Sequence, residues 1–131
     1  MKILFLGDVV GLSGRRKITN DLSIQLQKNN IDFVIINGEN ADDTGVGLTK
    51  EICIDFFENG VDVITTGNHV WDQKDIMNFI DKENRLLRPK NLFEPAPGRG
   101  FEIYETKNNY RVGVLNLMGN VFMKKCDDVF K

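Results

Sequence analysis

The sequence predicts an α/β fold in which parallel βαβ units are followed by a β-hairpin. Short apolar runs of strand length alternate with segments that have helical spacing of their apolar residues. Near the C-terminus, two further strand-like segments flank a polar turn. Consecutive βα units imply a parallel sheet with right-handed crossovers and helices packed on its faces.

The first three predicted strands are continuous apolar runs at residues 3–6, 33–36 and 61–64. A run of this length without alternating polar residues is typical of a strand buried on both faces.

Three other segments show the spacing of amphipathic helices. Asn29-Asn30 ends the first of them and Asn59-Gly60 ends the second. We expect Asp72 and Asp75 to cap the third helix at its start. The apolar residues of the three helices are Ile18, Leu22 and Leu26 (helix 13–27), Ile52, Cys53, Phe56 and Phe57, and Ile76, Phe79 and Ile80.

The pattern changes after Pro89. A turn-rich connection at residues 95–98 leads to two predicted strands, Phe101–Glu105 and 110–117, joined by the polar turn 107–109. We expect one domain over residues 1–131, and an uncovered face or edge on the second hairpin strand.

The composition indicates a soluble globular protein, with 41% hydrophobic and 27% charged residues. A net charge of −2 argues against a DNA or membrane-surface partner. The N-terminal apolar run stops at Gly7-Asp8, too early for a secretion signal, and no stretch has transmembrane length. Cys53 and Cys126 lack CxxC spacing and indicate reduced thiols. These features predict a cytoplasmic location.

Polar residues follow each of the first three predicted strands. These residues are Asp8, Glu39 with Asn40, and Asn68 with His69. The carboxyl ends of parallel strands meet at one rim of the sheet, so we expect all five side chains to converge in one pocket.

Two carboxylates in one pocket repel each other unless a cation lies between them. The oxygen-rich set suits a hard or borderline divalent ion. With two metals about 4 Å apart, Glu39 could bridge them while a bound hydroxide attacks phosphorus. His69 would then protonate the leaving oxygen, because imidazole titrates near neutrality.

Each residue also has a structural interpretation. Asp8 could simply close a strand, Glu39 and Asn40 could be turn or cap residues, Asn68 could satisfy a turn, and His69 could be incidental. The coincidence of ligand-type groups at all three strand ends favours a functional site. There is no nucleotide P-loop, no GxGxxG motif and no nucleophile elbow in the sequence.

The chain resembles the YmdB-type branch of the calcineurin-like metallophosphoesterases, bacterial 2′,3′-cyclic-nucleotide 2′-phosphodiesterases. The matching segments are residues 3–11, 37–41, 66–72 and 116–119, in the family's order across nearly the whole chain. The resemblance implies the N-terminal half of a metallophosphoesterase sandwich. It also implies that Asp8 and Glu39, with Asn40 close by, hold one metal, that Glu39 and Asn68 hold a second, and that His69 donates a proton. Iron, manganese or magnesium would be the metals and a small cyclic phosphodiester the substrate.

The chain also departs from the family. Family members are about twice as long, and their second half supplies three histidines that complete both metal sites; this chain has one histidine in total. We therefore expect a partner, either a separate C-terminal half or an oligomer. The alternatives are a truncated, non-catalytic fragment and a nucleotide- or protein-binding module. We expect the isolated chain to bind Mn²⁺ weakly and to hydrolyse cyclic phosphodiesters slowly or undetectably.

Overall fold

The computed structural model describes residues 1–93, 95–123 and 125–130. It confirms the predicted mixture of a parallel α/β unit and an antiparallel hairpin. Four parallel strands form one sheet in the order β1-β2-β3-β4, and β5 pairs with β6 in a separate hairpin. The strands are β1 (Ile3–Leu6), β2 (Phe33–Asn37), β3 (Val63–Thr65), β4 (Leu86–Leu87), β5 (Phe101–Glu105) and β6 (Arg111–Leu115). The helices are α1 (Gly11–Asn29), α2 (Lys50–Glu58) and α3 (Ile76–Phe79).

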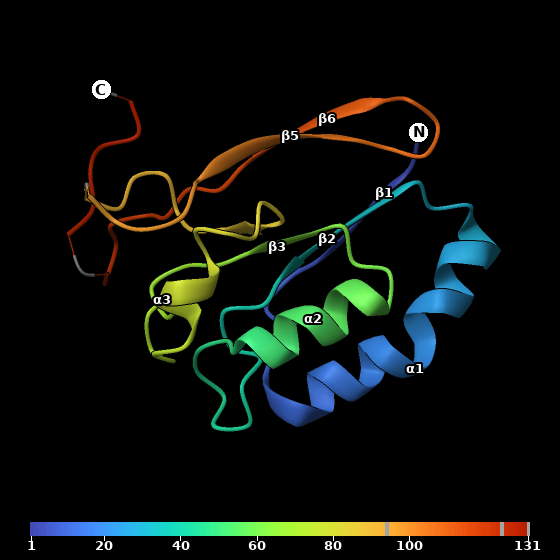
Figure 1. Cartoon of the computed structure of the whole chain (residues 1–131), viewed down its shortest axis with the longest axis horizontal. Helices are drawn as coiled ribbons and strands as arrows, with labels where there is room; N and C mark the ends of the chain where they lie inside the picture. The colour runs from blue at the N-terminus through green and yellow to red at the C-terminus, as the bar shows by residue number, and fades with distance from the viewer. Residues whose placement is uncertain (94, 124, 131) are drawn as a thin grey trace.

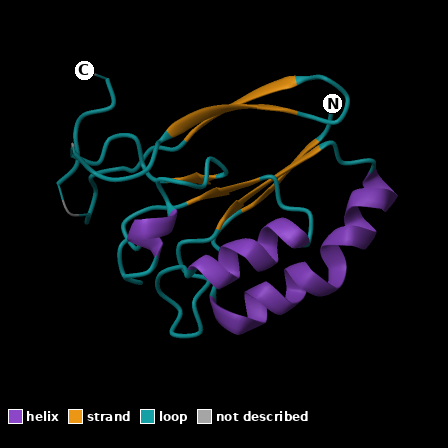
Figure 2. Ribbon diagram, in the orientation of Figure 1, coloured by secondary structure: helices purple, strands orange, loops and turns teal. Residues whose placement is uncertain are grey.

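The sheet lies between two layers. Figures 1 and 2 show α1 and α2 on one face and the β5–β6 hairpin on the other. Successive side chains of a strand point to opposite faces of the sheet, so each strand contributes to two hydrophobic clusters. Val34 and Ile36 of β2 belong to the cluster under the helices, whereas Phe33 belongs to the cluster under the hairpin. Burial on both faces is why β2 and β3 are continuously apolar. The same expectation for β1 is wrong, because Ile3 and Phe5 are 45% and 60% exposed.

The helix termini follow from local sequence. Asn30 ends α1 in the left-handed conformation, with φ of 52°, and its N–H bonds back to the last turn of the helix. The Thr49 hydroxyl caps α2 by accepting a hydrogen bond from the N–H of Ile52. Asn59 is the C-terminal cap of α2, as the sequence predicts. Within the described part of the chain, no helix combines the length and hydropathy needed to cross a membrane.

The third helix differs from the prediction. It is a single turn. Asp75 occupies its N-cap position, as predicted, but its side chain makes no capping hydrogen bond, and Asp72 does not cap the helix. The carboxylate of Asp75 accepts the backbone N–H of Lys50 at 3.0 Å, and that of Asp72 pairs with His69. Asp75 therefore bonds the first residue of α2, and Asp72 bonds a histidine of its own loop.

The hairpin is fixed to the sheet through its C-terminal end. The side-chain amide of Asn116 is buried and donates to the carbonyls of Thr66, at 2.7 Å, and Leu87, at 3.1 Å. These bonds join the end of β6 to the ends of β3 and β4. The outward face of β6 is uncovered, as predicted, with Leu115 about half exposed; the outward face of β5 is uncovered as well, at Phe101 and Ile103.

Candidate metal centre

The loops after β1 and β2 are held together by backbone hydrogen bonds. The N–H of Val9 donates to the carbonyl of Asn37, and the N–H of Gly11 donates to the carbonyl of Asn40, both at 2.9 Å. Asp8 adopts a left-handed backbone conformation, with φ of 44°, which is unfavourable for a residue with a side chain. The two bonds, which follow Asp8 directly in the chain, hold the loop that carries it at the rim of the sheet.

Asp8 and Asn40 are in direct contact. The Asn40 amide nitrogen donates to Asp8 Oδ1 at 2.7 Å. This bond sets the orientation of the amide, so the Asn40 Oδ1 atom faces away from the carboxylate. That oxygen is buried and has no hydrogen-bond partner among the described residues. A buried acceptor without a partner costs about 1–3 kcal/mol, and a bound cation would satisfy it.

Glu39 is half-buried and lies over Gly67. Its Oε2 accepts the backbone N–H of His69 at 3.1 Å, and its Oε1 lies 3.4 Å from the Asn37 amide nitrogen. A Cβ atom at position 67 would lie 2.6 Å from Glu39 Oε2 and 2.7 Å from its Cδ. Residue 67 must therefore be glycine for the carboxylate to occupy this position. In this way the β3 loop fixes Glu39 at the rim.

His69 is oriented by Asp72. The ring Nδ1 lies 2.6 Å from Asp72 Oδ2, which leaves Nε2 without a partner inside the described part of the chain. A carboxylate on Nδ1 selects the tautomer and fixes the ring plane, the arrangement found for histidines that transfer protons or bind metals. Asp72 thus orients His69 and does not cap a helix as predicted. Its spacing of three residues from His69 was the available signal, because i and i+3 side chains meet in a turn.

Asn68 lies at the same rim but is less constrained. Its side chain is exposed and makes no hydrogen bond within the described residues. The structure thus brings Asp8 to Asn40 and Glu39 to the backbone of His69, whereas the Asn68 amide contacts no hydrogen-bond partner in the part of the chain described. Asn37 was missed as a possible ligand: its Oδ1, like that of Asn40, is buried without a partner among the residues described.

The charge distribution at the rim suits a cation. Across residues 1–93, 95–123 and 125–130, no basic side chain forms an ion pair with Asp8 or Glu39. In the same residues no group of three His, Cys, Asp or Glu side chains is close enough to hold a metal ion. The donors present are two carboxylates and asparagine amides, which fit part of the coordination of a hard divalent ion.

Known proteins match this chain over nearly its whole length. The family model described as "YmdB-like protein" matches residues 4–131. The chain belongs to the YmdB-like family. It is 44% identical over 130 residues to the Bacillus subtilis protein named 2′,3′-cyclic-nucleotide 2′-phosphodiesterase, covering 99% of this chain and 48% of that protein.

Two solved structures share the fold. The crystal structure of a hypothetical protein from Thermus thermophilus superposes with a TM-score of 0.90 at 35% identity, over 99% of this chain and 50% of that one. A structure described as a novel phosphatase from Mycoplasma pneumoniae gives a TM-score of 0.89 at 34% identity, over 99% of this chain and 48% of that one. The fold is therefore the N-terminal half of the calcineurin-like metallophosphoesterase fold, as predicted. The chain spans about half the length of the relatives that it matches.

Proposed function

We propose that the chain carries part of the active site of a metal-dependent phosphodiesterase that acts on small cyclic phosphodiesters such as 2′,3′-cyclic nucleotides. The observation that carries this proposal is the contact between Asp8 and Asn40, at the rim where a second carboxylate, Glu39, accepts the N–H of His69. Membership of the YmdB-like family and the name of the Bacillus subtilis relative support the substrate class.

The residues of the chain divide into two roles. Asp8, Glu39, Asn40 and Asn68 would hold the metal ions, of which two would complete the site, with iron, manganese or magnesium suited to this donor set. When bound, the ions would supply positive charge at the phosphoryl oxygens and an activated water.

His69 would act on the leaving group. Its Nε2 has no partner within the described residues, and Asp72 holds the ring and stabilises the charged imidazolium through Nδ1. A proton on Nε2 is therefore available to the departing oxygen of the substrate. The side chains named here would occupy only some of the coordination positions of each metal ion. Full activity therefore needs further ligands in addition to these residues.

Two substrates with different leaving groups test this assignment. We expect Mn²⁺-dependent hydrolysis of 2′,3′-cyclic AMP and of bis-p-nitrophenyl phosphate, slow in the chain alone and absent in Asp8→Ala. His69→Ala should slow cyclic AMP hydrolysis strongly and affect bis-p-nitrophenyl phosphate less, because p-nitrophenolate leaves without a proton. Equal hydrolysis by Asp8→Ala and the wild type would reject the proposal.

A binding module is the second candidate, favoured by the incomplete donor set of the described residues. It predicts that Asp8→Ala and Glu39→Ala leave nucleotide or protein binding unchanged. We further propose that the chain works in the cytosol, which the free, buried thiols of Cys53 and Cys126 support.

A further inference from the structure

The connection between β2 and α2 contains a loop that is closed on itself. In this loop, residues 42–47, the N–H of Asp42 donates to the carbonyl of Gly47 at 3.0 Å, and the N–H of Gly45 donates back to the carbonyl of Asp42 at 2.8 Å. The Asp42 carboxylate accepts the N–H and the hydroxyl of Thr44, at 3.0 and 2.7 Å. The 42–47 loop is therefore a compact element and not an extended connection.

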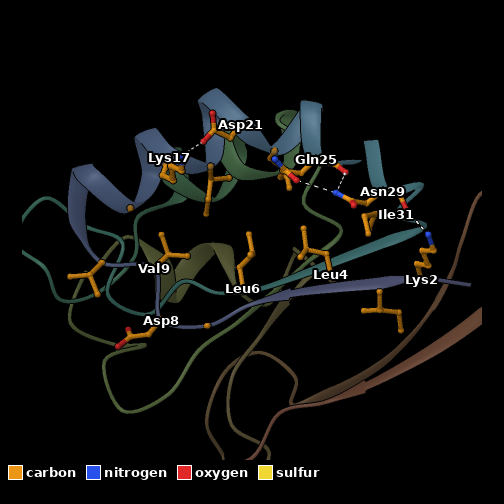
Figure 3. A pocket seen from close by; sticks show the side chains of 16 residues that line it. Lys2, Leu4, Leu6, Asp8, Val9, Lys17, Asp21, Gln25, Asn29 and Ile31 are labelled. Atoms are coloured by element: carbon orange, nitrogen blue, oxygen red, sulfur yellow. Dashed lines mark hydrogen bonds and ion pairs between the residues drawn. The ribbon is translucent and has the colours of Figure 1, made fainter. Parts of the chain in front are cut away.

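The near end of the 42–47 loop is fixed beside the candidate metal centre. The loop begins two positions after Asn40, whose amide donates to Asp8. Figure 3 shows the Asp8 side chain at the end of β1, pointing away from α1. The Arg15 guanidinium of α1 donates to the carbonyl of Ala41 at 2.5 Å and to the carboxylate of Asp43 at 2.6 Å. These bonds hold the start of the loop next to the residues that would bind the metal.

The far end of the 42–47 loop lies against the segment that orients His69. A Cβ atom at position 47 would lie 2.7 Å from Cγ of Gln73 and 3.3 Å from Cβ of Asp72. The Gln73 amide nitrogen donates to the carbonyl of Val46 at 3.2 Å. The two segments approach this closely because residue 47 has no side chain.

The contact between His69 and Asp72 needs support from the backbone. Both side chains are partly exposed, to 34% for His69 and 42% for Asp72. Exposed ion pairs are weak because water competes for both partners and because the side chains lose freedom. The 2.6 Å approach of Asp72 Oδ2 to His69 Nδ1 therefore depends on where the backbone places the two residues.

We propose that Gly47 is a positioning residue for His69. It allows the 42–47 loop to pack against Asp72 and Gln73, and this packing holds the Asp72 carboxylate on the His69 ring. One short loop then sets the place of the proton donor relative to the metal-binding Asn40. The catalytic consequence rests on the proposed function; the packing does not.

Two alanine substitutions in the same loop separate this contact from backbone strain. Gly47 and Gly45 both have a positive φ, of 84° and 82°, so alanine is strained at either position. Among the described residues, a Cβ atom at position 45 would meet only Val10, at 4.0 Å. Gly45→Ala is therefore the matched control for Gly47→Ala, because it strains the backbone without touching Asp72 or Gln73.

The tautomer of His69 is the readout. The chain has one histidine, so its ¹⁵N spectrum at alkaline pH, without metal or substrate, reports where the neutral ring carries its proton. We expect the proton on Nδ1 in wild type and in Gly45→Ala, and a shift toward Nε2 in Gly47→Ala, as in Asp72→Asn. Gln73→Ala removes the hydrogen bond to Val46 and should give a smaller shift in the same direction. This variant decides the question if Gly47→Ala does not fold.

The outcomes separate the positioning from the catalytic proposal. An unchanged tautomer in folded Gly47→Ala, an equal shift in Gly45→Ala, or, if Gly47→Ala does not fold, an unchanged tautomer in Gln73→Ala would each overturn the inference. If wild type hydrolyses 2′,3′-cyclic AMP, folded Gly47→Ala should do so at least about tenfold more slowly, and equal rates would also overturn it. A shifted tautomer in Gly47→Ala, with no hydrolysis by wild type, would count against the proposed function alone.

Discussion

The substitution Gly67→Ala tests how the β3 loop positions Glu39. The new Cβ would lie 2.6 Å from Glu39 Oε2 and 2.7 Å from its Cδ, so either the carboxylate or the loop must move. Moving the carboxylate breaks its 3.1 Å hydrogen bond from the N–H of His69. Residue 67 does not have a positive φ, so alanine is compatible with the backbone there.

The expected magnitude follows from two opposing effects. Overpacking of this kind costs about 1–3 kcal/mol. Replacement of glycine by alanine stabilises the folded state by about 0.4–1 kcal/mol, because alanine lowers the conformational entropy of the unfolded chain. We therefore expect a net loss of about 1–2 kcal/mol in the free energy of unfolding, measured by urea denaturation.

A double-mutant cycle identifies the cause. In a Glu39→Ala background the atoms that collide with the new Cβ are absent, so Gly67→Ala should cost about 0 kcal/mol or stabilise slightly. The coupling energy between the two positions should then be about 1 kcal/mol or more. An equal cost of Gly67→Ala in both backgrounds would refute the contact with Glu39 as the reason for glycine at this position.

Three further predictions concern His69, Asp62 and Asn116. The chain has one histidine, so ¹⁵N labelling of histidine gives one imidazole; the neutral ring should carry its proton on Nδ1, and Asp72→Asn should shift it to Nε2, whereas an unchanged tautomer would exclude the Asp72 contact. Burial raises the pKa of Asp62 above its ordinary value of 3.8, although the hydrogen bond from the N–H of Val34 acts in the opposite direction. The folded state therefore binds this proton more tightly than the unfolded state. The burial of the charged carboxylate destabilises the fold, and this destabilisation is lost as the pH falls through the folded-state pKa. When the pH is lowered from about 7 to about 4, the free energy of unfolding measured in urea should therefore rise less for Asp62→Asn than for wild type. An identical pH profile of the two proteins would count against the burial effect. Asn116→Ala should lower the free energy of unfolding by about 1–3 kcal/mol, because it removes two buried hydrogen bonds; a loss below about 0.5 kcal/mol would show that the hairpin is held by other contacts.

The α/β core could be predicted because its pattern is local. The apolar runs of β1, β2 and β3 and the four-residue spacing of Ile18 and Leu22 are visible in the sequence and are confirmed within a few residues. Strand β4 was missed because it has two residues, Leu86 and Leu87, too few for a periodic pattern. Helix α3 was overestimated because its apolar spacing continues into a turn that is not helical.

The rim residues could be predicted because parallel strands end on one side of a sheet. The contacts between these residues could not be predicted from the sequence. The role of Asp72 was hidden because a carboxylate three residues after His69 also fits a helix cap. The Oδ1 of Asn37 has no partner among the described residues, and Phe5 is exposed. Both features depend on how far the neighbouring loops and the hairpin reach across the sheet. That reach is set by packing between segments distant in the sequence.

Titration of the chain with Mn²⁺, followed by the electron paramagnetic resonance of the free ion, tests the metal site most directly. Wild type and Glu105→Gln, a matched change of an exposed carboxylate on the hairpin, should bind Mn²⁺ weakly and with equal affinity. Asp8→Asn and Glu39→Gln should each bind at least about tenfold more weakly. Equal affinity in all four proteins would contradict a metal centre at the rim of the sheet.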